Sequence, residues 1–106
     1  MKVGIILQTN DPEKVWNGLR FANAGIKQHH EIKLFLLGSG VEVESIYEEG
    51  FDIQKELQEF VASKGLVMAC GTCLKTRHQE ASAMCPISNM VDCVQMVEWS
   101  DKTITF

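Results

Sequence analysis

Three short apolar segments, each followed by small or polar residues, constrain the fold of this chain more than any other feature. They cover residues 3–7, 31–37 and 66–69 and are rich in large apolar residues, several of them β-branched. Segments of this kind are typical of strands that are covered on both faces. Stretches with helical spacing of apolar residues lie between them. Strands that alternate with helices predict an α/β layered fold, with a mainly parallel sheet and helices on both faces.

The two helices between these segments carry recognisable start signals. Asp11 and Pro12 suit the N-cap and the first helical position of a helix that ends near residues 28–30. Asp52 is a second candidate N-cap, and Gly65 is expected to stop that helix. The apolar side of the second helix is predicted to contain Ile53, Leu57, Phe60, Val61 and Lys64.

The rest of the chain is less regular. The stretch 41–47 fits either a strand or a helical turn, and residues 74–84 show no clear pattern. Pro86 and Ser88 indicate the start of a last helix, and residues 102–106 are predicted to form a closing strand. The inner face of the last helix is expected to contain Met90, Cys93, Val94 and Val97. The sheet then has four to five strands in a single domain, because 106 residues are too few for two cores.

Charge and composition exclude several classes of partner. The formal net charge is -4 and the ten basic residues are scattered, which argues against nucleic-acid binding. The amino-terminal apolar run is too short to span a membrane and has no signal-peptide cleavage site. These features predict a cytoplasmic protein with no membrane association. In that reducing compartment its four cysteines stay free of structural disulfides.

The carboxyl ends of the predicted strands point to one chemical site. Ligand sites of parallel sheets lie at these ends, which are followed here by residues 8–10, 38–40 and 70–73. The last of these reads Cys70-Gly71-Thr72-Cys73. A cysteine reacts as its thiolate, and cationic neighbours or a helix start lower its ordinary pKa of about 8.5. We therefore expect Cys70 to be the reactive residue.

The residues around Cys70 are assigned supporting roles. Gly71 and Thr72 are predicted to begin a short helix whose backbone N–H groups face the sulfur, and Asn10 is expected to line the pocket. The cations expected to stabilise a thiolate are Lys75, Arg77 and His78.

The other cysteines leave alternatives open. Cys73 either resolves an adduct on Cys70, shares a metal with it, or packs against the sheet. Cys85 is a possible third thiol. Zinc binding by Cys70, Cys73, His78 and Cys85 is a further alternative, although their spacing does not form the usual two knuckles. The preferred prediction includes neither a metal nor a cofactor. Cys93 is expected in the core.

Several segments together resemble one family. The opening Lys2–Leu7, the central Gly65–Lys75 and the closing Met90–Asp92 and Ser100–Phe106 are similar to the DsrE/DsrF-like family, which includes the Tus sulfur-relay subunits. The similarity extends over nearly the whole chain, and its strongest motif is a cysteine directly after a buried strand.

This resemblance implies a flavodoxin-like fold, assembly into homo- or hetero-oligomers, and a persulfide carried on that cysteine between sulfur donor and acceptor proteins. The carrier role falls on Cys70. Cys73 departs from many relatives and leaves open whether a persulfide on Cys70 persists or becomes a disulfide.

Three functions therefore compete. The first is a sulfur-relay protein, sulfurtransferase-like if it is an enzyme at all, that uses Cys70. The second is a dithiol redox protein that uses Cys70 and Cys73. The third is a non-enzymatic assembly subunit, for which Val41, Val43, Ile46 and Tyr47 could supply an interface or cover the core.

Overall fold

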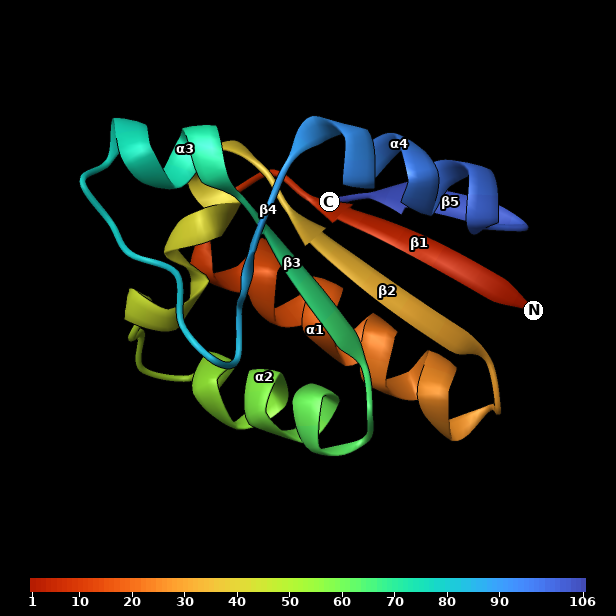
Figure 1. Cartoon of the computed structure of the whole chain (residues 1–106). Helices are drawn as coiled ribbons and strands as arrows, with labels where there is room; N and C mark the ends of the chain where they lie inside the picture. Colours follow the sequence, from red (N-terminus) through yellow and green to blue (C-terminus); the bar gives the residue numbers. More distant parts are fainter.

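The computed structural model describes all 106 residues and contains one five-stranded sheet (Figure 1). The strands are β1 (Lys2–Leu7), β2 (Glu31–Leu36), β3 (Leu66–Cys70), β4 (Ile87–Ser88) and β5 (Lys102–Thr105). The helices are α1 (Pro12–Lys27), α2 (Ile53–Ala62), α3 (Gly71–Thr76) and α4 (Met90–Trp99), with a 3-10 helix η1 (Gly38–Ser45). The strand order is β4-β3-β2-β1-β5 and every neighbouring pair is parallel. The predicted α/β layered fold is confirmed.

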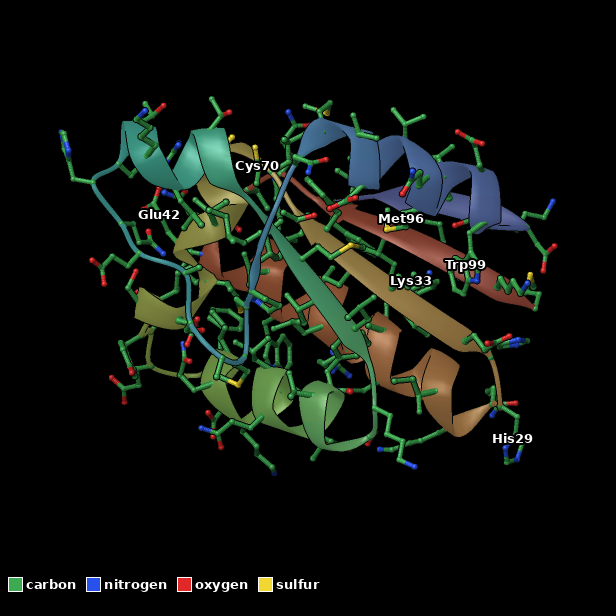
Figure 2. The ribbon with its side chains drawn as sticks, in the orientation of Figure 1. His29, Lys33, Glu42, Cys70, Met96 and Trp99 are labelled. Carbon is green, nitrogen blue, oxygen red and sulfur yellow. The ribbon has the colours of Figure 1, made fainter.

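The helices cover both faces of the sheet. Helices α1 and α2 pack against each other on one face, and α4 lies across the other (Figure 1). Two consecutive residues of β2 illustrate this, because successive side chains of a strand point to opposite faces of the sheet. Ile32 packs against Gly25 of α1, whereas the Lys33 ammonium lies 4.1 Å from the centre of the Trp99 ring of α4 (Figure 2). None of the helices is long and apolar enough to cross a bilayer.

The predicted starts of the first two helices are confirmed. The Asp11 carboxylate accepts a hydrogen bond from the backbone N–H of Lys14 at 3.0 Å, and Asp52 accepts one from Lys55 at 3.2 Å. Each cap satisfies a backbone donor that a helix start otherwise leaves unpaired. These caps fix where α1 leaves the carboxyl end of β1 and where α2 begins.

The predicted end of α2 is wrong by two residues. The helix ends at Ala62 with Ser63 as its C-cap, and Lys64 lies beyond it with φ +67°. Lys64 therefore takes the left-handed turn that was expected at Gly65, and it does not belong to the apolar side of the helix. The Gly65 N–H instead donates a hydrogen bond to the Phe60 carbonyl at 2.9 Å.

The stretch that fitted two patterns forms η1, so the helical alternative is correct for its first part. Val41 and Val43 are buried and cover the core, whereas Tyr47 is exposed. η1 is the segment that follows β2 at the carboxyl edge of the sheet.

The predicted orientation of the last helix is wrong in part. Asn89 caps α4 by accepting from the Asp92 N–H at 2.9 Å, and Ile87–Ser88 forms the short β4 rather than the helix start. The buried residues of α4 are Cys93 and Met96. The other three residues expected on its inner face are exposed: Met90 to 55%, Val94 to 53% and Val97 to 44%. Apolar residues lie on both sides of α4, so their spacing alone could not identify the side that meets the sheet.

Candidate thiol site

Cys70 lies where β3 ends and α3 begins, between α3 and the start of α4 (Figure 2). It pairs with Ser88 of β4 in the sheet register and occupies the N-cap position of α3. Its side chain makes no capping hydrogen bond, and the residue is only 4% exposed. The predicted position at the carboxyl end of a buried strand is therefore correct, but the sulfur lies under other side chains.

Cys73 is the more exposed thiol of the pair, and Cys70 is its neighbour. The backbone N–H of Gly38, at the start of η1, donates to the Cys73 Sγ at 3.2 Å. Burial raises the pKa of Cys73, and the neighbouring Cys70 raises it further, while the Gly38 N–H and the Arg77 charge act in the opposite direction. Cys73 thus holds its proton more firmly than a free cysteine.

The glycines after β2 make the Cys73 contact possible. Gly38 has φ +56°, a conformation that side chains disfavour, and this directs its N–H toward Cys73. At Gly40, an added Cβ would lie 2.1 Å from the backbone oxygen of Leu7. Only glycine allows η1 to approach β1 this closely. The segment 38–40 therefore binds a thiol, a role that its sequence alone does not indicate.

Arg77 contacts the backbone of Cys73 and also binds the carboxylate of Glu42. Its Nη1 donates to the Cys73 carbonyl at 3.2 Å, and its Nε donates to the Glu42 Oε2 at 2.9 Å. The Nδ2 of Asn10 donates to the other Glu42 oxygen at 3.4 Å. Asn10 is therefore held beside η1. Glu42 was not identified from the sequence, and its signal was its place two residues after the glycine segment at the same sheet edge.

The remaining predicted cations do not contact the thiols. Lys75 and His78 are exposed and line an open depression of about 540 Å³ together with Gly71 and Ile87. Thr72 is also exposed, and its carbonyl accepts a hydrogen bond from Thr76 at 2.9 Å. Gly71, which follows Cys70 directly in the chain, lines this depression, whereas Cys70 itself does not.

The other two cysteines are buried in different surroundings. Cys85 lies beside Glu44 and Ser82, and burial together with the Glu44 charge raises its pKa to about 12. Ser82 hydrogen-bonds both to Glu44 and to the Cys85 N–H. Cys93 lies close enough to Cys70 for that thiol to raise its pKa, although burial is the larger cause. Cys85 therefore stays a protonated thiol that anchors the loop before β4.

The residues of the zinc alternative do not form a ligand set. Nowhere in the chain do three His, Cys, Asp or Glu side chains gather in a way that could hold a metal ion. The site consists of the Cys70–Cys73 pair with its supporting loops. Fold and site together define a small α/β protein that holds two adjacent thiols at the carboxyl edge of a parallel sheet.

The chain belongs to the DsrE/DsrF-like family, which matches residues 1–106 and is generally linked to sulfur relay. An uncharacterized protein of Methanocaldococcus jannaschii, MJ0989, is 26% identical over 100 residues, which cover 89% of this chain and 88% of that protein.

Solved structures are similar over the whole length. The ychN protein of E. coli superposes with a TM-score of 0.85 at 26% identity, covering 100% of both chains. The protein of unknown function BT1422 from Bacteroides thetaiotaomicron gives a TM-score of 0.78 at 17% identity, covering 99% of this chain and 94% of its own, and supports the fold alone.

Proposed function

We propose that this protein carries sulfane sulfur as a persulfide on Cys70, in the reducing cytoplasm, with Cys73 as its assisting thiol. The observation that supports this most is the pair of adjacent thiols at the carboxyl edge of the sheet. The Cys73 Sγ accepts a hydrogen bond from the Gly38 N–H at 3.2 Å, and burial raises the pKa of Cys73, so that it keeps a proton beside the other sulfur. Membership of a family linked to sulfur relay supports the same assignment.

The transfer needs no external oxidant. The Cys70 thiolate attacks the terminal sulfur of a donor persulfide, the donor's sulfur–sulfur bond breaks, and the donor leaves as a thiolate that takes up a proton. An acceptor thiolate then attacks the terminal sulfur on Cys70 and releases the Cys70 thiolate. The Cys73 thiol stabilises the Cys70 thiolate before loading and after release. Donor and acceptor are therefore proteins that present a cysteine to this sheet edge.

The burial of Cys70 determines how a donor reaches it. At 4% exposure the sulfur is not open to a second protein. Cys70 is the N-cap residue of α3, which has only six residues, and the depression lined by Gly71 does not include Cys70 itself. Loading therefore requires a local opening at the start of α3, a motion available to short elements with little buried surface.

The same pair favours a dithiol redox function as the second candidate. If Cys73 loses its proton after loading, it can attack the Cys70 sulfur, form a disulfide and release hydrosulfide. A thiol reductant must then restore the pair.

Intact-mass measurement after incubation with an inorganic polysulfide tests the proposal. We expect Cys73→Ser to gain one sulfur atom and to retain it, because the thiol three residues away is absent. The wild-type protein is expected to gain one sulfur atom and to keep it while Cys73 stays protonated; a product two hydrogens lighter than the reduced protein would instead mark the disulfide of the redox function. If neither protein gains sulfur, the carrier proposal is wrong. If the wild type forms the disulfide while Cys73→Ser never gains sulfur, the redox function replaces it.

We also propose that the protein self-associates through one apolar surface, the α4 surface. It consists of Ile87, Met90, Val91, Val94 and Val97, which are all exposed on β4 and α4. Contiguous apolar side chains on the surface of a small protein mark an interaction site. A second copy of this chain, packed here, would remove them from water.

Light scattering with size-exclusion chromatography tests the self-association. Wild-type protein is expected to elute as an oligomer, and Val94→Lys is expected to shift it toward monomer because a charge on the α4 surface opposes burial. Tyr47→Lys is the matched control, since Tyr47 is exposed elsewhere on the molecule. A monomeric wild type, or equal dissociation by both variants, would contradict this assignment.

A further inference from the structure

Glu42 occupies the centre of the contacts that join the three loops at the thiol edge. Its two carboxylate oxygens accept from Asn10, which follows β1, and from Arg77, which follows α3, while Glu42 itself belongs to η1, which follows β2. The Glu42 and Arg77 side chains are 32% and 31% exposed, so the ion pair is only partly screened by water. Figure 2 shows Glu42 close to α3.

Arg77 is the positively charged residue that acts on the pKa of Cys73. It donates to the Cys73 carbonyl at 3.2 Å, and its charge favours the Cys73 thiolate. The other groups around Cys73 are the Gly38 N–H from η1 and the Cys70 thiol from β3, and Cys93 of α4 in turn faces Cys70. Without a counter-charge, Arg77 would promote ionisation of the outer thiol of the pair.

We propose that Glu42 is a positioning residue that fixes the order in which the two thiols ionise. By pairing with Arg77 it offsets the guanidinium charge near Cys73, so Cys73 keeps its proton and donates it toward the Cys70 sulfur. Glu42 also holds η1 against α3, which keeps the Gly38 N–H on the Cys73 sulfur. This inference rests on the proposed function, because it explains how Cys70 and not Cys73 becomes the attacking thiolate.

The rate of Cys73 alkylation as a function of pH tests this role, measured with iodoacetamide and peptide mass mapping in a Cys70→Ser background. Glu42→Gln keeps the shape and an acceptor oxygen but removes the charge. We expect it to move the midpoint of the alkylation profile about half a pH unit lower. Arg77→Gln is expected to move the midpoint in the opposite direction.

Glu49→Gln is the matched control, because it removes an equal charge from an exposed carboxylate with no hydrogen-bonded partner. It is expected to leave the midpoint unchanged. Simple loosening of the loops would expose Cys73 in both test variants and would lower both midpoints, so a shift of Arg77→Gln in the same direction as Glu42→Gln overturns the proposal. So does an unchanged midpoint in Glu42→Gln. No sulfur donor is present in this assay, and failure of sulfur loading therefore leaves its outcome unaffected.

Discussion

Replacement of Cys70 by serine is expected to abolish sulfur loading. Serine keeps the size of the side chain, but its hydroxyl is not ionised near neutral pH and cannot attack a sulfane sulfur as the thiolate does. The loading measured by intact mass with polysulfide should fall to the level of a protein without cysteines.

The remaining cysteines supply the controls for this prediction. Cys93→Ala removes a buried thiol close to Cys70, and Cys85→Ala removes one beside Glu44. Both variants are expected to load as the wild type does, provided that thermal unfolding confirms a folded state. Loading that survives in Cys70→Ser and disappears in Cys73→Ser would transfer the carrier role to Cys73 and contradict the assignment.

The largest effect on stability is expected from Phe60→Ala. Phe60 of α2 is 0% exposed, and its ring packs so closely on Gly65 that an added Cβ there would lie 2.4 Å from the ring. Truncation removes the contacts of a full aromatic ring and leaves a cavity that the surrounding strands cannot fill. Such changes cost about 3–5 kcal/mol. Guanidinium unfolding followed by tryptophan fluorescence measures the loss.

Phe21→Ala provides the matched comparison. Phe21 of α1 is 42% exposed, and its ring meets Phe106 at a centroid distance of 5.7 Å. The same truncation at this position removes a partial contact and leaves no closed cavity, so a clearly smaller destabilisation is expected. Equal losses for the two variants would show that the Phe60 ring is not tightly packed in the core.

Much of the fold was predictable because its signals are local. The central strands are short apolar runs, and Asp11 and Asp52 are caps whose partners lie three residues away. The side of α4 that meets the sheet was not predictable, since apolar residues lie on both of its sides. β4 has only two residues and is a strand because it pairs with β3. No pattern inside such a short segment distinguishes it from a loop.

In the candidate site too, the local features were predictable from the sequence and the long-range contacts were not. Cys70 and Cys73 lie three residues apart, and their position after a buried apolar run is enough to predict a thiol pair from the sequence. The contacts that tune them are long-range: Gly38 to Cys73 and Glu42 to Arg77 each span 35 residues. They depend on how η1 folds back over α3, a tertiary arrangement that the sequence of either segment does not contain.

The pairing of β5 with β1 has a consequence for biosynthesis. The N–H of Phe106 donates to Ile6, and its carbonyl accepts from Gln8, both at 2.8 Å, so β1 is completed by a strand that is synthesised about 100 residues later. Until translation reaches β5, one edge of β1 stays without its hydrogen-bonding neighbour. Vectorial folding of this domain therefore finishes only after its final strand has left the exit tunnel.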